Sequence, residues 1–253
     1  MAVQLFAFTC GHVTSAREGF LEGEAGSLTV PVPVYLIVHD AGKVLFDTGL
    51  NLAIRQAQAR LLGPAAADWQ IDFPGDAQIV PQLARLGIAP PDIRYVVNSH
   101  LHFDHCGGNA QFPGATLVVH AKEWRAAQRP ALHAAGIYNP IDFDHMKSVR
   151  QVDGELDLFG DGSVVVFPTP GHTPGHQSLR LTLASGSVVL AADCCYLKQT
   201  LDRTHLPKNA YNKDQMRASL DLLRGFQAGG ARVFFGHDPD FWKTVPQAPH
   251  PVA

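Results

Sequence analysis

The hydrophobic pattern of this chain is dominated by short apolar runs rich in valine, leucine and phenylalanine. Glycine, asparagine and aspartate separate many of these runs, which is typical of buried β-strands rather than of helices. The runs that predict strands cover residues 1–8, 34–38, 44–46, 93–97, 116–119, 164–167, 178–183, 188–192 and 232–236. Glycine-containing turns at residues 39–42 and 184–187 join two pairs of these runs and predict β-hairpins.

Three other segments predict helices, at residues 53–60, 79–87 and 121–128. The second of them ends on Gly87, a common helix stop. Residues 9–30 are polar and glycine-rich, and they predict a long loop of the kind that often binds ligands. Residues 130–147 have no clear period, and we expect them to form one wall of a pocket.

The second half of the chain repeats the order of elements in the first half. In each half, a predicted hairpin ends in an aspartate, Asp47 or Asp193, and a later apolar strand ends in a histidine, His100 or His237. This parallel suggests an internal duplication. Two β-rich halves that meet at one site imply an α/β protein with two packed sheets and helices outside, an αββα sandwich. We expect a single domain over residues 1–253.

Composition excludes several classes of protein. The chain has 253 residues, of which 46% are hydrophobic and 17% charged, so it can bury a sizeable core. Its net charge of −3 comes without a basic patch, which argues against nucleic acid as a partner. No stretch is long enough to span a membrane, and the N-terminus lacks the positive region of a signal peptide. The four cysteines do not resemble a disulfide framework, so we expect a cytoplasmic protein.

The chemistry of the chain is concentrated in residues 99–109, with the sequence SHLHFDHCGGN. In an extended segment, residues two apart face the same way, so His100 and His102 can bind one cation. Asp104 and His105 follow where the chain turns and must point elsewhere, which suggests a second cation. The alternative is a histidine-rich surface loop, but imidazoles and a carboxylate at this spacing seldom occur without a metal.

The pattern HxHxDH resembles the signature of the metallo-β-lactamase superfamily. That resemblance implies three more ligands: a lone histidine after a strand, a bridging aspartate, and a last histidine near the C-terminus. The sequence offers His172 in TPGHTPGH, Asp193 in AAD, and His237 in FFGHD. The resemblance also implies the αββα fold. In addition, Asp47 in DTG resembles a family motif whose aspartate supports the metal loop from behind. A plain cap at the end of the strand is the alternative role for Asp47.

The resemblance implies how the ligands divide between two metals. One metal would take His100, His102 and His172, the other would take Asp104, His105 and His237, and Asp193 would bridge them. Nitrogen and oxygen donors suit Zn²⁺, which we expect, but also Fe²⁺, Mn²⁺ or Co²⁺. Two cations about 3.5–4 Å apart can hold a bridging hydroxide and polarise a carbonyl, so the expected reaction is hydrolysis. Three cysteines flank the ligands, but His or Asp already fills each ligand position; they are Cys106, Cys194 and Cys195.

Within the superfamily, the chain resembles the N-acyl homoserine lactone lactonases, the quorum-quenching enzymes that open the lactone ring of bacterial signals. The segments SHLHFDHCGGN, TPGHTPGHQSL and FFGHD carry this resemblance, together with Tyr196 three positions past Asp193. It implies that Tyr196 hydrogen-bonds the lactone carbonyl, that the bridging hydroxide attacks it, and that Asp104 carries the proton to the departing oxygen. A buried core tyrosine is the alternative for Tyr196. Cys106 departs from the family, where alanine is more common at this position.

The acyl tail of such a substrate must leave the metals along the loops. The apolar residues available to it are Phe20, Trp69, Ile71, Phe73, Phe103, Ile137 and Tyr138. We expect residues 65–75 to form a lid over the site. The alternatives for the lid residues are ordinary core or a contact between the subunits of a homodimer.

Other functions share these motifs. The main alternative is a hydrolase of another small lactone, ester or thioester. Glyoxalase-type thioester hydrolases carry a C-terminal helical domain, whereas only sixteen residues follow His237 here. Secreted β-lactamases need an export signal, which the sequence does not show. A di-iron redox or oxygen-sensing protein would usually replace ligand histidines by carboxylates and attach a flavin domain.

Overall fold

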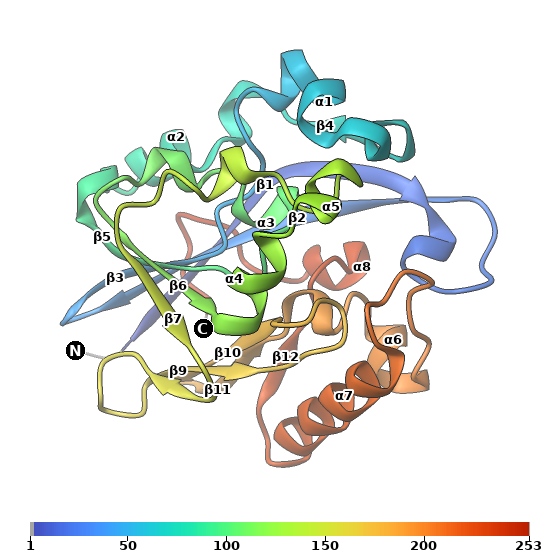
Figure 1. The fold of residues 1–253 in the computed structure, drawn as a ribbon. Helices are drawn as coiled ribbons and strands as arrows, with labels where there is room; N and C mark the ends of the chain where they lie inside the picture. The colour runs from blue at the N-terminus through green and yellow to red at the C-terminus, as the bar shows by residue number, and fades with distance from the viewer. Residues whose placement is uncertain (1–2, 253) are drawn as a thin grey trace.

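Two β-sheets pack face to face in this protein, and helices cover their outer sides (Figure 1). The structure is a computed structural model that describes residues 3–252. A seven-stranded sheet has the order β4-β1-β2-β3-β5-β6-β7, and a five-stranded sheet has the order β12-β11-β10-β9-β8. The αββα sandwich predicted from the sequence is confirmed.

The strands of the seven-stranded sheet come from the first part of the chain. They are β1 (Gln4–Ala16), β2 (Ser27–His39), β3 (Gly42–Phe46), β4 (Gln70–Asp72), β5 (Ile93–Val97), β6 (Thr116–His120) and β7 (Val149–Val152). The strands of the five-stranded sheet follow in the second part. They are β8 (Leu156–Asp157), β9 (Val164–Pro168), β10 (Gln177–Leu183), β11 (Gly186–Leu190) and β12 (Arg232–Phe234).

The helices are mostly short. They are α1 (Ile54–Leu62), α2 (Ile79–Ala84), α3 (Phe103–Cys106), α4 (Ala121–Ala127), α5 (Pro130–Ala134), α6 (Lys198–Arg203), α7 (Lys213–Ala228) and α8 (Pro239–Trp242). Within the described residues, no helix combines the length and the apolar character that crossing a bilayer requires.

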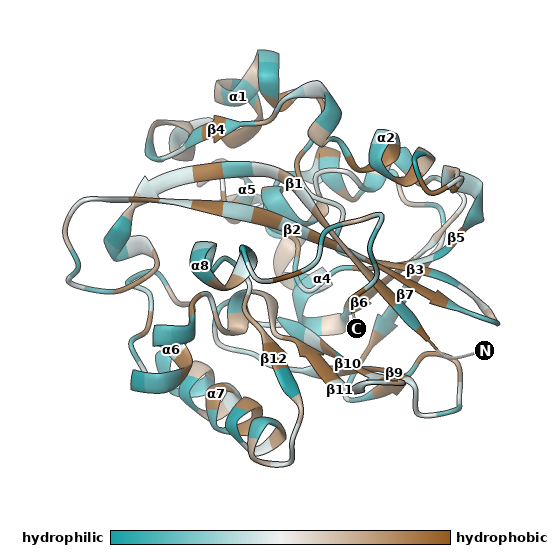
Figure 2. Ribbon diagram, turned by 180° about the vertical axis from the view of Figure 1, so that it is seen from behind, coloured by the Kyte–Doolittle hydropathy of each residue, from teal (hydrophilic) through white to brown (hydrophobic). Residues whose placement is uncertain are grey.

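Apolar side chains of both sheets form the central layer of the core. This layer includes Leu5, Ile37, Val44, Val97, Val164, Leu181 and Leu190, each with at most 1% of its surface exposed. Figure 2 shows the strands largely brown and the outer side of α7 largely teal, so polar residues face outward there. Helix α7 covers the outer side of the five-stranded sheet through Met216, Leu220 and Leu223, which repeat at helical spacing. The Asn212 side chain caps this helix by accepting from the backbone N–H groups of Asp214 and Gln215.

The long loop predicted over residues 9–30 is wrong. Strand β1 continues to Ala16 and β2 begins at Ser27, so only the tip of a long hairpin is irregular. Val13 pairs with Val30, and the neighbouring Thr14 and Thr29 hydroxyls lie 2.7 Å apart on the other face. Polar residues in this stretch therefore form the exposed face of a twisted hairpin. In residues 9–30, the alternation of buried and exposed positions indicates strands, whereas the overall polarity of the segment wrongly predicted a loop.

The two halves of the chain repeat one arrangement of strands. Strands β2 and β3 are antiparallel and β3 and β5 are parallel, just as β10 and β11 are antiparallel and β11 and β12 are parallel. The last paired residues are Val97 on β5 and Phe234 on β12. His100 and His237 each follow three positions later. Strands β5 and β12, each parallel to its neighbour, therefore deliver one histidine from each sheet to the same end of the sandwich.

Candidate metal centre

A short helical turn shapes the HxHxDH segment. Strand β5 ends at Val97, His100 follows outside any strand or helix, and His102, in extended backbone, is the N-cap of α3. Asp104 and His105 then lie within the helix, where successive side chains point about 100° apart. The change from extended to helical backbone lets Asp104 and His105 point toward His237, whereas His100 and His102 point toward His172.

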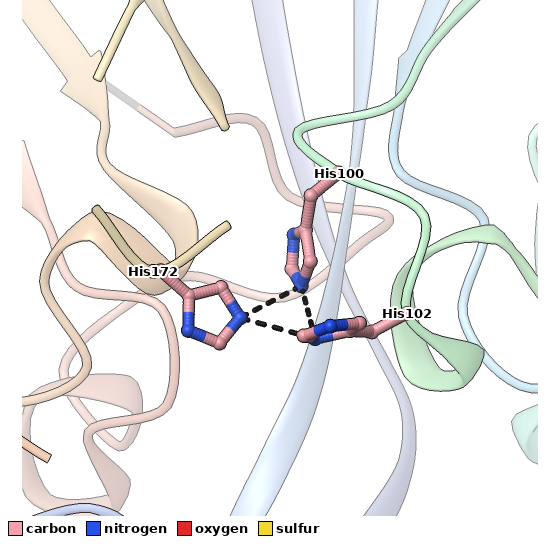
Figure 3. Close-up of side chains that lie close together, drawn as sticks. All are labelled: His100, His102 and His172. Carbon is pink, nitrogen blue, oxygen red and sulfur yellow. Dashed lines mark hydrogen bonds between the residues drawn. The ribbon is translucent and has the colours of Figure 1, made fainter. Parts of the chain in front are cut away.

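Three histidine nitrogens converge at the first group of side chains (Figure 3). His100 Nε2 lies 3.0 Å from His102 Nδ1, and His172 Nε2 lies 3.1 Å from each of them. Donors on a tetrahedral zinc ion, each about 2.0–2.1 Å from it, are separated by about 3.3 Å. Burial lowers the pKa of His102 to about 4, so its ring stays neutral and can donate a lone pair.

A second group contains Asp104, His105 and His237. The Nε2 atoms of His105 and His237 lie 3.3 Å apart. Asp104 Oδ2 lies 3.5 Å from the first of them and 3.6 Å from the second. All three side chains are buried and offer one donor atom each toward a common point.

Asp193 lies between the two groups and directs one oxygen to each. Its Oδ2 is 3.3 Å from His172 Nε2 and 3.7 Å from His100 Nε2. Its Oδ1 is 3.0 Å from His237 Nε2 and 3.2 Å from His105 Nε2. Burial alone would raise the pKa of Asp193, but the neighbouring His105, His237 and His172 hold it well below its ordinary value. The side chain is therefore an ionised carboxylate placed to bridge two cations.

Hydrogen bonds behind the ligands fix where the histidine protons lie. His237 donates from Nδ1 to the carbonyl of Pro31 at 2.8 Å, and His105 donates from Nδ1 to Asp47 Oδ2 at 2.8 Å. With those protons on Nδ1, the neutral form of each ring has a free Nε2 lone pair. Asp193 Oδ1 then faces two lone pairs and is buried without a hydrogen-bond donor. A bound cation would stabilise this buried anionic oxygen.

Asp47 supports the metal loop from behind, in the position that the sequence suggested. Its two oxygens accept from the backbone N–H and the hydroxyl of Ser99, each at 2.8 Å, in addition to His105. Because the Ser99 hydroxyl donates to Asp47, it must accept at 3.0 Å from His100 Nδ1. His100 therefore also presents a bare Nε2. Asp47 itself has a φ of 60°, the left-handed region that aspartate tolerates better than most residues.

The donor set fits two divalent cations. Five histidines and two aspartates converge, their lone pairs are free, and one buried anionic oxygen has no donor. The cysteines next to the ligands are buried, and within residues 3–252 no cysteine takes part in such a group. The chemistry of these side chains is that of a dinuclear metal site, although the identity of the metal does not follow from it.

Tyr196 lies beside the metal ligands. Its hydroxyl is 3.2 Å from His172 Nδ1, and its ring centroid is 5.6 Å from that of His237. Asp193 lies in a 3-10 turn over Ala192–Cys194, with Ala192 at a φ of 46°, and Cys195 then continues in extended backbone to Tyr196. This turn brings the bridging carboxylate and the tyrosine hydroxyl to the same side of the site.

The residues predicted to hold an acyl tail are distributed unevenly. Phe20 contacts Tyr196 and Trp69, with ring centroids 5.4 and 6.4 Å apart, and Trp69 contacts Phe103 at 5.4 Å. Tyr138 lies against His102, with centroids 5.5 Å apart. The other three are dispersed: Ile71 is half-buried on β4, Ile137 is exposed, and Phe73 is 5% exposed within the core. An aromatic wall thus runs from Tyr196 through Phe20 and Trp69 to Phe103.

The segment predicted as a lid, residues 65–75, is only partly irregular. It contains a 3-10 turn over Gly63–Asp68 and the short strand β4, which pairs with β1 at the edge of the sheet. Trp69 lies between the two, and Gln58 on α1 donates to its carbonyl at 2.8 Å. The segment is therefore tied to both α1 and β1.

Two buried polar residues near the site were not found from the sequence. Glu123 is fully buried and accepts hydrogen bonds from both ligand-bearing loops. His176 is also fully buried, with its ring centroid 5.3 Å from that of His100 and its Nδ1 within 2.9 Å of the Thr169 hydroxyl. The repeated PGH of TPGHTPGH was a signal for His176. Nothing in the local sequence distinguished Glu123 from a surface glutamate of a short helix.

Comparison with known proteins agrees with this geometry. The profile of the metallo-beta-lactamase superfamily matches residues 28–237. The N-acyl homoserine lactonase AttM of Azorhizobium caulinodans is 35% identical over 236 residues, 90% of this chain and 89% of that protein. An N-acyl homoserine lactonase of Bacillus thuringiensis is 32% identical over 83% of this chain and 82% of its own.

Solved structures give the same result. An N-acyl homoserine lactone hydrolase with the product N-hexanoyl-L-homoserine at its catalytic metal centre superimposes with a TM-score of 0.89, at 27% identity and over the full length of both chains. The AiiA variant of B. thuringiensis with N-decanoyl-L-homoserine bound gives the same TM-score at 26% identity, again over both full chains. With its fold, its site and its sequence relatives in agreement, the chain belongs to the metallo-beta-lactamase superfamily, as a relative of the N-acyl homoserine lactonases in it.

Proposed function

We propose that this protein is a dinuclear metal hydrolase that opens the lactone ring of N-acyl homoserine lactones. The observation that carries the proposal is Asp193, whose two oxygens face two separate histidine groups while Tyr196 lies next to one of them. Relatives named as lactonases share about a third of its sequence over most of its length. A hydrolase of another small lactone or ester is the second candidate, because the same site could attack any strained ester carbonyl.

The proposed ligand assignment follows the two groups. His100, His102 and His172 would hold one cation, Asp104, His105 and His237 the other, and Asp193 both. We propose zinc, because nitrogen and carboxylate donors in this number suit it. When bound, two such cations supply Lewis acidity and lower the pKa of water towards neutrality.

The protein's own groups would position the substrate and move the proton. Burial raises the pKa of Tyr196 well above its ordinary value, so its hydroxyl remains a donor at neutral pH. This hydroxyl is proposed to donate to the lactone carbonyl oxygen, where negative charge develops. Asp104 is buried at the edge of the second group, and it is proposed to carry the proton to the departing ring oxygen.

Replacing Tyr196 by Phe is expected to lower kcat by about 10²-fold while both metals stay bound. A donor aimed at a developing oxyanion contributes on the order of 10²–10³ in rate, and the metals share this task here. The measurement is steady-state hydrolysis of an acyl homoserine lactone, with elemental analysis on the same sample. An unchanged kcat would remove Tyr196 from the mechanism.

Longer acyl tails are expected to be better substrates. Each buried methylene is worth up to about 0.8 kcal/mol, of which an open groove returns only part. A six-carbon extension should therefore raise kcat/KM by roughly one to two orders of magnitude. Trp69→Ala should flatten this trend, because Trp69 forms the middle of the aromatic wall between Phe20 and Phe103.

Short-chain lactones serve as the control for Trp69→Ala, since their contacts to the metals and Tyr196 are unchanged. They should be hydrolysed nearly as before. A uniform loss across chain lengths, with a change in molecular mass in solution, would indicate that Trp69 belongs to a homodimer contact instead. A wild-type enzyme without any dependence on tail length would remove these residues from the tail site.

Proton release on lactone opening tests the function itself. We expect a pH indicator to report rapid ring opening of acyl homoserine lactones and slower opening of a simple γ-lactone that lacks the acyl amide. Equal rates on both would favour the second candidate. No hydrolysis of either by the metal-loaded protein would overturn the proposal.

A further inference from the structure

Glu123 is a fully buried carboxylate that accepts four hydrogen bonds. Oε1 accepts from the backbone N–H of Leu101 at 3.1 Å and from the hydroxyl of Tyr138 at 3.0 Å. Oε2 accepts from the hydroxyl of Thr173 at 2.7 Å and from the backbone N–H of Gly175 at 3.1 Å. Among residues 3–252, no lysine, arginine or histidine forms an ion pair with it. Burying a charge is costly unless it is paired or fully hydrogen-bonded, so this site is built around the carboxylate.

The four donors all adjoin one group of metal ligands. Leu101 lies between His100 and His102, Thr173 directly follows His172, and Gly175 comes three positions after His172. The ring of Tyr138, whose hydroxyl donates to Glu123, lies 5.5 Å from the ring of His102. None of the donors adjoins His105 or His237, whose outer nitrogens donate to Asp47 and to the Pro31 carbonyl.

Close packing makes this arrangement rigid. Glu123 lies in the first turn of α4, and a Cβ on Gly175 would come within 2.1 Å of the Glu123 backbone nitrogen. The loop that carries His172 therefore touches the backbone of α4, and the carboxylate joins that loop to the one that carries His100 and His102. These loops come from the two halves of the chain, 72 residues apart at His100 and His172.

We infer that Glu123 is a positioning residue for one half of the metal centre, the half formed by His100, His102 and His172, and that it has no such role for the other half. The inference rests on the proposed dinuclear site. Burial raises the pKa of Glu123, whereas its four donors favour the ionised form. Asp47 has the corresponding position behind His105.

Glu123→Gln tests this assignment. The amide replaces one acceptor oxygen by an NH₂ group that faces two donors. The hydroxyl of Thr173 or Tyr138 can rotate to accept from it, but the backbone N–H of Gly175 or Leu101 cannot. In either amide orientation, one backbone hydrogen bond to a ligand-bearing loop is lost.

The expected result is selective loss of one metal. Outer partners of metal ligands typically contribute 10–100-fold in affinity, so competition with a chelator should show one site weakened about that much and the other unchanged. Cobalt in place of the native metal should show altered absorption from one of two ions. Asp47→Asn should instead weaken mainly the site that contains His105, because Asp47 accepts from His105 directly and reaches His100 only through the Ser99 hydroxyl. Stability of the metal-free protein is measured in parallel by thermal unfolding.

Asp142→Asn is the matched control. Asp142 is another buried carboxyl, and its hydrogen-bond donor is Asn51 Nδ2 at 2.6 Å rather than a group of the two loops that Glu123 joins. The Asp142→Asn protein should bind both metals with the affinity of the wild type. Glu123→Gln protein that binds both ions with wild-type affinity, and is only less stable without metal, would overturn the inference.

Milder variants keep the test decisive if Glu123→Gln fails to fold. Thr173→Val and Tyr138→Phe each remove one hydroxyl donor, and each should weaken the same metal site by a few-fold. No weakening in either variant would overturn the inference. Because affinity is measured without substrate, a wild type that binds two metals but does not open lactones would contradict the proposed function alone.

Discussion

Asp193→Ala is expected to lower lactone hydrolysis on the order of 10³-fold and to reduce the bound metal from about two ions per chain to at most one. Outer partners alone are worth 10–100-fold, and Asp193 faces both histidine groups directly, at 3.0–3.7 Å. Its loss also leaves four histidine nitrogens, two facing each oxygen, without their carboxylate partner. Elemental analysis of protein purified without added metal, together with the steady-state rate, measures both effects.

Asp153→Ala is a control for the loss of an aspartate. The side chain of Asp153 is 83% exposed and lies 4.0 Å from His120. Metal content and rate should be those of the wild type. Full activity of the Asp193 variant with one ion per chain would rule out the two-metal mechanism.

Gly171→Ala is expected to lower the free energy of unfolding by about 4 kcal/mol or more. Losses this large have few causes, among them backbone strain and overpacking. Gly171 has a φ of +133°, and a Cβ there would lie 2.3 Å from the backbone nitrogen of Met216. Neither backbone can yield easily, because Asn212, the cap of α7, donates to the Gly171 carbonyl at 2.9 Å. The adjacent His172 should be displaced as well. Thermal unfolding and metal titration measure the two consequences.

Gly186→Ala separates the strain of the backbone angle from the clash. Gly186 has a similar φ of +119°, but nothing lies within 4 Å of the position of its missing Cβ. Its substitution should cost only about 1–2 kcal/mol and leave metal binding intact. Equal costs at the two glycines would show that the contact with α7 is unimportant.

Four of the seven predicted metal ligands were accessible from the sequence because their spacing is local, whereas His172, Asp193 and His237 were implied only by the resemblance to a family. HxHxDH occupies six positions, and the strand before it can be recognised from β-branched residues alone. The αββα sandwich could also be predicted from local features, because each hairpin and each parallel strand corresponds to its own apolar run. The assignment of individual ligands to two cations stays a prediction.

The features of the fold and the site that could not be predicted from the sequence depend largely on contacts between residues far apart in the chain. Glu123 and Thr173 are 50 positions apart, and no local pattern relates them. Polar residues in the β1–β2 hairpin hid how far these two predicted strands extend, because the exposed face of an antiparallel pair is as polar as a loop. Helix α7 was also missed, although Met216, Leu220 and Leu223 follow a 3.6-residue period after a capping asparagine.

The contribution of both halves of the chain to each ligand group has a consequence for folding. His100 and His172 are 72 positions apart, and His105 and His237 are 132 positions apart. A cation held by either pair closes a chain loop of that length, as a disulfide would, and restricts the unfolded chain correspondingly. All four cysteines are free thiols. Metal ions bound at the two groups would thus be the cross-links of this protein, and the concentration of free metal would set how tightly its two halves are held together.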